Sequence, residues 1–348
     1  MAQAAAILGC AGPSLDREEA AYFAAAQPWG FILFARNVET PDQLHGLTHD
    51  LRAAVGRNAL ILIDQEGGRV QRLRSPFWRE WQPALDQMWI VAHAGSAAAL
   101  RAMYLRSRLI AHELHAMGID ANCAPLADVA RPGTHPILHN RLYGSTAETV
   151  AQAGASVAAG LLDGGVIPIL KHMPGHGLAT VDSHETLPRV AAERATLENV
   201  DFAAFRPLAH LPLGMTAHVV YDAIDPNLPG TVSPDVIALI RTQIGFDGLL
   251  MTDDISMGAL RGPVGPRAAD ARAAGCDIIL HCNGVRAEMD AVLAHCGVLS
   301  GPAAVRAQIA LDARRPPHPL DIAQAEAEFT ALTDPMHTVN ESDGTPHA

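Results

Sequence analysis

Short apolar runs recur along the chain, and stretches with helical periodicity separate them. Within a run, the residues do not alternate strictly between polar and apolar, which is typical of strands buried on both faces. Such strands occur in parallel sheets whose two faces are covered by helices. The pattern predicts eight strands, at Ala4–Gly9, Gly30–Ala35, Ala59–Asp64, Ile119–Val129, Val166–His172, Leu213–Val219, Gly248–Asp253 and Cys276–Cys282.

Alanine-rich segments with helical spacing lie between most of these runs. Several predicted strands follow a glycine, namely Gly118, Gly165 and Gly275. A glycine at this place can adopt the left-handed conformation that ends a helix. The clearest predicted helices are Ser96–Met117, Ala147–Asp163 and Pro234–Ile244, with a last one at Leu320–Leu332.

Eight strand–helix units predict an α/β fold, a single (β/α)8 barrel of the TIM type. We assign the barrel to residues 1–332 and expect the polar residues 333–348 to form a flexible, partly disordered tail. A doubly wound open sheet is the alternative. It is disfavoured because no G-x-G-x-x-G motif follows the first predicted strand.

Polar residues stand where most of the predicted strands end. The carboxyl ends of barrel strands converge on one mouth, and the active sites of TIM barrels form there. We therefore expect the functional residues among the polar groups at these ends: Arg36, Asn37, Asp64, Asp128, Lys171, His172, His218, Asp253, Asp254 and Asn283.

Composition narrows the range of partners. Acidic residues outnumber basic ones 37 to 25, and the net charge of −12 comes without any basic run, so we expect no nucleic-acid or membrane partner. Five cysteines without a C-x-x-C pair indicate reduced thiols in the cytoplasm and argue against a structural zinc site. The apolar run before Cys10 is too short for a signal peptide. No apolar run reaches the roughly 20 residues of a membrane span.

The stretch 171–188, KHMPGHGLATVDSHETLP, is too polar for a core and too broken for a helix. Asp182 and His184 are two residues apart, so on an extended segment they point the same way and the carboxylate can meet the imidazole. Such a pair fixes the histidine tautomer and raises its basicity. Pro174, Gly175 and Gly177 could let this segment swing toward a bound ligand, which we treat as a hypothesis.

The sequence blocks resemble a known family. KHMPGHG followed by DSH (171–184), LIDQEGGRVQRL (62–73), GFDGLLMTDDISMGAL (245–260) and AGCDIILHCN (274–283) occur in the order found in family 3 glycoside hydrolases of the β-N-acetylglucosaminidase type. The resemblance runs from about residue 5 to residue 315. The length of the chain is similar to that of the bacterial cytoplasmic enzymes of peptidoglycan recycling.

The resemblance implies a role for individual residues. Asp253 is expected to be the nucleophile that forms a covalent glycosyl-enzyme, with Asp254 as its rival. His184, paired with Asp182, is expected to be the general acid and base. The residues expected to bind the sugar are Asp64, Arg141, Lys171 and His172.

One block departs from the family pattern. Where the family commonly has I-G-D-R-S-F, this chain has LHNRLYG at 138–144, so Asn140 replaces the acid and Arg141 remains. Among neighbouring groups, we expect an ion pair between Glu66 and Arg69. His176 is interpreted as a brace for its loop, and His218 as either a cavity-lining or a purely structural residue.

The implied function is a retaining exo-β-N-acetylglucosaminidase that removes terminal N-acetylglucosamine from anhydro-muropeptides, without cofactor or metal ion and as a monomer. Chitooligosaccharides as substrates, phosphate as acceptor and catalysis by the substrate's own acetamido group remain open. Three rivals from other classes are a metal-dependent hydrolase using the histidines of 171–184, a Schiff-base aldolase using Lys171, and a sugar-binding barrel without activity.

Overall fold

The computed structural model describes residues 2–92 and 95–334. Most of the expected tail, residues 335–348, therefore lies outside the described residues. Strands form at or close to all eight predicted places. The strands are β1 (Ala4–Gly9), β2 (Pro28–Leu33), β3 (Leu60–Ile63), β4 (Ala121–Asn122), β5 (Ile167–Met173), β6 (Arg189–Val190), β7 (Leu213–Thr216), β8 (Val220–Tyr221), β9 (Leu249–Met251) and β10 (Ile279–His281).

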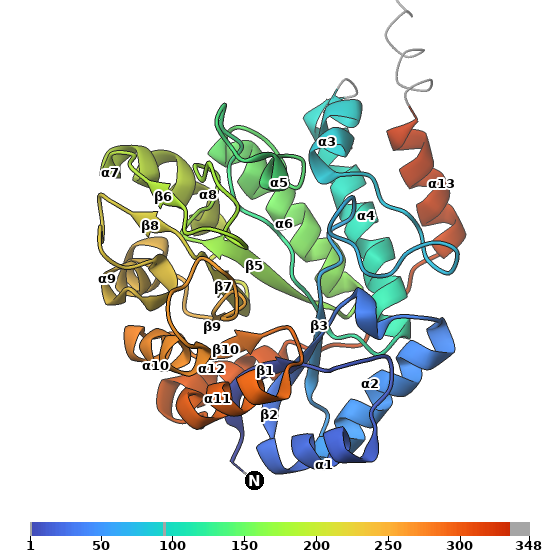
Figure 1. Cartoon of the computed structure of the whole chain (residues 1–348). Coiled ribbons are helices and arrows are strands. Elements are labelled where there is room, and N and C mark those ends of the chain that lie inside the picture. Colours follow the sequence, from blue (N-terminus) through green and yellow to red (C-terminus); the bar gives the residue numbers. More distant parts are fainter. Residues whose placement is uncertain (1, 93–94, 335–348) are drawn as a thin grey trace, which may run out of the picture.

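Eight of these strands form one parallel sheet in the order β10-β1-β2-β3-β4-β5-β7-β9 (Figure 1). A parallel bridge between Met251 and Ile278 joins the two ends of this order, so the sheet closes on itself. The prediction of a (β/α)8 barrel is confirmed, and the open doubly wound sheet is excluded.

β4 is much shorter than the predicted strand 119–129. Pro125 interrupts it, because proline has no N–H to donate to a neighbouring strand. Pairing with β5 resumes beyond the proline, where the Ala127 amide donates to the Lys171 carbonyl at 2.8 Å. The chain after β4 is therefore bent but still tied to the strand that carries Lys171.

Helices surround the barrel (Figure 1). The helix predicted at 234–244 begins as α9, and its last turn widens into a π-helix, η5 (Ile240–Ile244). The α-helices are α1 (Arg17–Ala26), α2 (Pro41–Val55), α3 (Ala84–Ala92), α4 (Ser96–Ala116), α5 (Pro136–His139), α6 (Ala147–Asp163), α7 (Arg194–Thr196), α8 (Phe202–Phe205), α9 (Pro234–Leu239), α10 (Val264–Ala274), α11 (Arg286–Cys296), α12 (Gly301–Asp312) and α13 (Ile322–Thr333).

Short elements complete the connections between the longer ones. They are the 3-10 helices η1 (Ala35–Asn37), η3 (Arg206–Leu208) and η4 (Gly230–Val232), and a π-helix, η2 (Leu197–Asp201). The glycines predicted to end helices, Gly118, Gly165 and Gly275, all have positive φ angles, of 73°, 76° and 113°. A left-handed backbone at these points is easiest for glycine, because any other residue would pay a steric cost there.

The barrel strands divide their side chains between two apolar clusters. On β1, Ile7 belongs to the inner cluster, while Ala6 and Leu8 face the surrounding helices. This alternation follows from the two-residue period of a strand. The inner cluster also includes Ala307 and Ala310 of α12, so a helix contributes to the packing of the barrel interior.

Two features were not predicted from the sequence. A second, two-stranded sheet pairs β6 with β8 and lies beside β5, close to the segment that carries His184 (Figure 1). At the other side, α13 packs on α3 and α4. The Phe329 and Trp81 rings meet edge to face, with their ring centres 5.5 Å apart. Among the described residues, no helix has both the length and the apolar character needed to cross a bilayer.

Candidate active site

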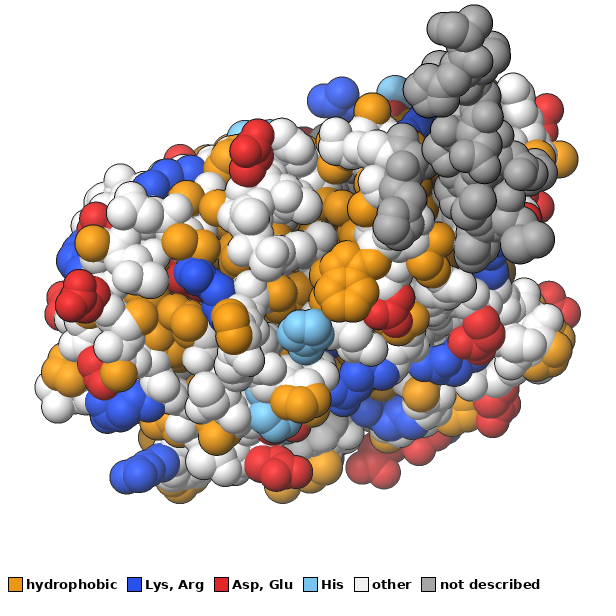
Figure 2. Space-filling view, turned by 90° about the horizontal axis from the view of Figure 1, so that it is seen from above, with side chains coloured by type: hydrophobic (Ala, Val, Ile, Leu, Met, Phe, Trp, Pro, Cys, Tyr) orange, Lys and Arg blue, Asp and Glu red, His pale blue; other side chains and the backbone are white. Residues whose placement is uncertain are grey.

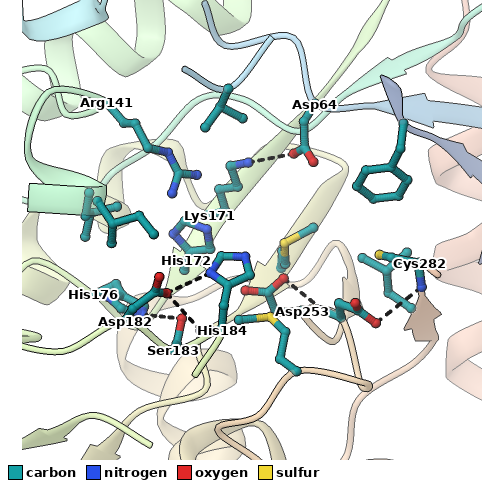
Figure 3. Close-up of a pocket in the computed structure, with 18 of the residues that line it drawn as sticks. Asp64, Arg141, Lys171, His172, His176, Asp182, Ser183, His184, Asp253 and Cys282 are labelled. Carbon is teal, nitrogen blue, oxygen red and sulfur yellow. Dashed lines mark hydrogen bonds and ion pairs between the residues drawn. The ribbon is translucent and has the colours of Figure 1, made fainter. Parts of the chain in front are cut away.

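A cavity of about 290 Å³ lies at the carboxyl ends of the barrel strands. On the face shown in Figure 2, acidic and basic side chains are interspersed, with histidine side chains among them. All seven predicted site residues line this cavity: Asp64, Arg141, Lys171, His172, Asp182, His184 and Asp253 (Figure 3).

One side of the cavity is built from a network of charged side chains, which we call the charged wall: Asp64, Glu66, Arg72, Arg141 and Lys171. Glu66 lies buried behind the other four, which line the cavity. The Lys171 ammonium lies 3.0 Å from Asp64 Oδ1 and 2.6 Å from Glu66 Oε1. Arg72 donates to the other Asp64 oxygen at 3.0 Å. The wall therefore alternates in sign, with each carboxylate shared between two cations.

Arg141 forms a bidentate ion pair with Glu66. Its Nε and Nη2 donate to the two Glu66 oxygens at 2.8 and 2.7 Å. The third nitrogen, Nη1, makes no hydrogen bond to any described residue, so a donor remains for a ligand. The predicted pair between Glu66 and Arg69 is wrong, because Arg69 donates instead to the Ile137 carbonyl at 2.8 Å. Glu66 is buried inside the wall, whereas Arg69 is exposed at the rim, out of position to neutralise it.

Burial and pairing act in opposite directions on the charges of the wall. Burial alone would raise the pKa of the Asp64 carboxyl, but the Lys171 ammonium and the Arg72 guanidinium outweigh it and hold that pKa well below its usual range. Burial would likewise lower the pKa of Lys171, and the carboxylates of Asp64 and Glu66 raise it instead. Asp64 and Lys171 therefore stay ionised at neutral pH, as a fixed acceptor and a fixed donor.

His172 is oriented from behind by Asp128. Its Nδ1 donates to Asp128 Oδ2 at 2.8 Å, which leaves Nε2 on the side of the cavity. Asp128 also accepts the backbone N–H of His176 at 2.6 Å. Burial alone would raise the pKa of Asp128, but His172 and His176 together lower it. Asp128 thus acts as scaffold, and it determines which nitrogen of His172 faces a ligand.

The two aspartates after β9 have different surroundings. Asp253 lines the cavity, and its Oδ1 accepts the Asp254 amide at 2.8 Å. Burial would raise the pKa of Asp253, but His172 and the Asp254 amide help to hold it below its usual value, so the carboxylate is ionised. Asp254 is instead occupied by its own loop, accepting from the Ser256 hydroxyl at 2.8 Å and the Cys282 amide at 3.2 Å.

His218 has a supporting position next to these aspartates. It is fully buried, and its Nε2 donates to the Asp254 carbonyl oxygen at 3.0 Å. Its Nδ1 meets the Thr231 hydroxyl at 2.7 Å. Burial lowers the pKa of His218, so the ring is neutral and serves as a brace for the loop that carries Asp253.

On the opposite side, Asp182 and His184 form the predicted pair. Asp182 Oδ1 accepts both the backbone N–H of His184, at 2.9 Å, and its ring Nδ1–H, at 2.8 Å. The Nε2 atom is therefore the one left for proton transfer. The His184 side chain is 63% exposed, against 14% for Asp182. Figure 3 shows Asp182, His184 and Asp253 around the same cavity.

The base of this segment is more firmly held than its composition suggests. Gly177 packs so tightly under Val129 that a Cβ there would lie 2.0 Å from the Val129 carbonyl oxygen. The Gly177 carbonyl accepts from the Thr134 hydroxyl at 2.6 Å, and the Ala179 carbonyl accepts from the His135 amide at 3.0 Å. The glycines thus allow close packing in this conformation. Any swing of the segment would begin beyond Ala179.

The comparisons with known proteins identify the family of the chain. A model of the glycosyl hydrolase family 3 N terminal domain matches residues 6–309. The chain belongs to glycosyl hydrolase family 3. It is therefore a glycoside hydrolase, as the resemblance of its sequence blocks implied.

Two relatives of this family 3 chain are named beta-hexosaminidase. A beta-hexosaminidase from Alkalilimnicola ehrlichii is 40% identical over 294 residues, which cover 83% of each chain. A beta-hexosaminidase from Methylococcus capsulatus is 34% identical over 95% of this chain and 98% of its own. A crystal structure of NagZ from Neisseria gonorrhoeae in complex with N-trifluoroacetyl-D-glucosamine is 29% identical. It has a TM-score of 0.79 and covers 96% of this chain and 99% of that one.

Sequence reasoning missed two members of the site. Arg72 shares Asp64 with Lys171 and stacks over the Phe34 ring, with its guanidinium carbon 5.2 Å from the ring centre. Glu66 holds both Lys171 and Arg141. Both residues lie in the block 62–73, and their closeness to Asp64 in the sequence was the available signal that they belong to the site. Among the described residues, no cluster of three or more His, Cys, Asp or Glu could hold a metal ion.

Proposed function

We propose that this family 3 glycoside hydrolase is a retaining exo-β-N-acetylglucosaminidase. It releases terminal N-acetylglucosamine from peptidoglycan fragments of the anhydro-muropeptide type. The observation that carries the proposal is that Asp253 and the Asp182–His184 pair line one cavity that also contains the charged wall. The beta-hexosaminidase relatives and the amino-sugar complex of the Neisseria gonorrhoeae structure support this reading.

In the first step of the proposed mechanism, Asp253 attacks the anomeric carbon of the terminal sugar. The glycosidic C–O bond breaks, and His184 Nε2 gives its proton to the departing oxygen. In the second step, neutral His184 takes a proton from water, and the water oxygen attacks the same carbon and frees Asp253. Two inversions give net retention of the anomeric configuration.

The surroundings of the two groups suit these roles. The low pKa of Asp253 keeps it ionised and ready to attack. Burial would raise the pKa of Asp182, but its two hydrogen bonds from His184 lower it, so a carboxylate faces the imidazole. That carboxylate stabilises the imidazolium that must form in each catalytic cycle. Asp254, which is occupied within its loop, is less available than Asp253.

The charged wall supplies the sugar contacts of the proposal. Lys171 Nζ and Arg141 Nη1 retain donors, and the Asp64 carboxylate retains lone pairs for hydroxyl groups. The apolar side chains of Ile32, Met215 and Leu280 also line the cavity and can pack against a pyranose ring. A cavity of about 290 Å³ accommodates one sugar ring, which favours cleavage at a chain end.

The proposed setting is the cytoplasm, with the enzyme acting as a monomer. All five cysteines are free thiols and buried, as expected in a reducing compartment.

The deciding experiment is product analysis with a purified anhydro-muropeptide that carries terminal N-acetylglucosamine. We expect free N-acetylglucosamine, identified by mass, with the β-anomer appearing first in NMR spectra. First appearance of the α-anomer would contradict the covalent mechanism. Release from chitobiose but not from the muropeptide would overturn the substrate class, and formation of the sugar 1-phosphate in phosphate buffer would reveal phosphorolysis.

A second experiment tests the nucleophile directly. An activated 5-fluoro derivative of N-acetyl-β-glucosaminide should slow breakdown of the intermediate more than its formation and leave a label on the protein. Peptide mapping should place the label on Asp253. No label, with continued turnover of the ordinary substrate, would point to attack by the substrate's acetamido oxygen instead.

A further inference from the structure

The segment 180–187, which we call the lid, carries both members of the proposed acid–base pair. Asp182 contacts the backbone and the ring of His184, so this pair is internal to the lid. Internal contacts of this kind would move with the lid and cannot fix its position over the cavity. The position must come from contacts between the lid and the rest of the barrel.

One such contact is made by Ser183. This side chain is buried although it stands between Asp182 and the exposed His184. Its Oγ lies 3.3 Å from Nε2 of His176 (Figure 3). The backbone of His176 is in turn fixed by Asp128, so Ser183 ties the lid to the same scaffold that orients His172. Burial and the neighbouring His172 lower the pKa of His176 to about 4, so its ring is neutral at physiological pH.

A second attachment joins the lid to the loop after β9. The amide of Gly258 donates to the His184 carbonyl at 3.1 Å, and the amide of Ala259 donates to the Ser183 carbonyl at 3.2 Å. The same loop carries Asp253, five residues before Gly258. Arg267 of α10 stiffens this loop by donating to the carbonyls of Ile255 and Met257, both at 3.0 Å.

Only glycine fits at position 258 when the lid is docked. A Cβ atom at this position would lie 2.8 Å from the His184 carbonyl oxygen and 2.9 Å from that of Glu185. Both atoms belong to the backbone of the lid, so no rotation of a side chain relieves the overlap. A larger residue would push the lid away from the loop of Asp253.

We propose that Ser183 and Gly258 are positioning residues, which together dock the lid so that His184 faces Asp253 across the cavity. This inference rests on the proposed role of His184 as acid and base. It assigns no contact with substrate to either residue. It implies that the distance between the two catalytic groups is determined mainly by main-chain hydrogen bonds between two loops.

The test compares Gly258→Ala, Ser183→Ala and His184→Ala with the wild-type enzyme. A matched control is Gly46→Ala in α2, where an added Cβ meets nothing within 4 Å. For each, kcat/KM is measured on a β-linked N-acetylglucosamine disaccharide, which needs protonation of its leaving group. It is measured in parallel on a dinitrophenyl glycoside, which does not.

We expect Gly258→Ala to lose about tenfold or more on the disaccharide, which corresponds to one or more lost hydrogen bonds. The loss on the dinitrophenyl glycoside should be only about twofold, because that substrate bypasses the acid. Ser183→Ala should show the same asymmetry, with a loss of about fivefold on the disaccharide. Gly46→Ala should match the wild type on both substrates. Limited proteolysis within 180–187 should be faster in Gly258→Ala than in the control.

The outcomes separate this inference from the proposed function. If His184→Ala shows no preference for the activated substrate, the acid assignment fails, and the inference fails with it. If His184→Ala shows the preference but the other two variants behave as wild type, or lose equally on both substrates, the inference alone is overturned. Should Gly258→Ala not fold, Ser183→Ala decides by the same criteria.

Discussion

The charged wall and the lid face each other across one cavity but are built differently. In the wall, the Lys171 and Glu66 side chains are only 2% and 4% exposed and are held by ion pairs inside the barrel. In the lid, His184 is 63% exposed, and its segment is held by the hydrogen bonds of Ser183 and of the Gly258 and Ala259 amides. The binding groups are therefore fixed by the fold, whereas the position of the acid–base group depends on how a surface segment docks.

The largest effect is expected for Asp253→Ala, which removes the proposed nucleophile. The carboxylate contacts mainly the neighbouring amide of Asp254, so its removal should leave the fold intact. Loss of a nucleophile should reduce kcat by on the order of 10⁴-fold or more. Circular dichroism and thermal melting check the fold, and turnover of an aryl N-acetylglucosaminide checks activity. Substantial residual turnover with a retained fold would show that Asp253 is not the nucleophile.

For the lid, the corresponding change is His184→Ala. We expect kcat/KM to fall by about 10²- to 10⁴-fold on a disaccharide with a poor leaving group and far less on an activated aryl glycoside. Melting temperature should hardly change, because the side chain is exposed. Equal losses on the two substrates would show that His184 does not transfer the proton, and the lid would then carry no acid–base group.

Lys171→Met in the charged wall and Asp182→Asn in the lid compare how much each region contributes to the free energy of unfolding. Without Lys171, the buried carboxylates of Asp64 and Glu66 lose a shared cation, and the free energy of unfolding should drop by about 3–5 kcal/mol. Asp182→Asn weakens an exposed pair and should cost about 1 kcal/mol or less. Urea denaturation at neutral pH measures both. Similar losses of unfolding free energy in the two variants would mean that the ion pairs of the wall contribute no more to stability than the pair in the lid.

A smaller effect concerns the support beneath the lid. Asp201 packs against Gly175, and Arg131 lies 3.4 Å from its carboxylate. Burial raises the pKa of Asp201 to about 6 from an unfolded value of 3.8, against the opposing influence of Arg131. Between these values the native state binds more protons than the unfolded state. This residue therefore lowers the free energy of unfolding as pH rises from about 4 to 6.

Asp201→Asn should abolish that contribution. A difference of about 2 between the two pKa values corresponds to about 3 kcal/mol. Relative to the variant, the wild type should lose up to this amount across the window, measured as the difference between two urea-derived stability curves at several pH values. Parallel curves for the two proteins would show that Asp201 titrates normally and places no strain on the lid's support.

The sequence was sufficient for the barrel because strand and helix periods are local signals. The seven site residues were expected on two different grounds. Asp64, Lys171, His172 and Asp253 stand at predicted strand ends, which converge in a barrel. Arg141, Asp182 and His184 were expected only from the resemblance to the family, and in the structure all seven line one cavity. The sequence failed for Glu66, because its partner Arg141 is 75 residues away and only the closed barrel brings them together. The nearer Arg69 was the natural but wrong choice of partner.

The glycines of the hinge hypothesis show a second limit of the sequence, while the hypothesis itself stays a prediction. Gly175 and Gly177 suggested flexibility, yet in the structure they allow the chain to pass close to Asp201 and Val129. A glycine serves either purpose, and the choice depends on tertiary packing, which no local pattern contains. The same holds for Gly258, whose role is visible only from the carbonyl groups that lie above it.

The contact between the lid and the loop of Asp253 uses main-chain atoms on both sides. Glu185 and Thr186 point outward and take no part in it through their side chains, so both positions are open to redesign. A protein engineer could exchange both side chains, which line a separate surface hollow and not the active-site cavity, while keeping the docking geometry. Side-chain variation on the outer surface of the lid is therefore compatible with the main-chain contacts that hold the lid in place.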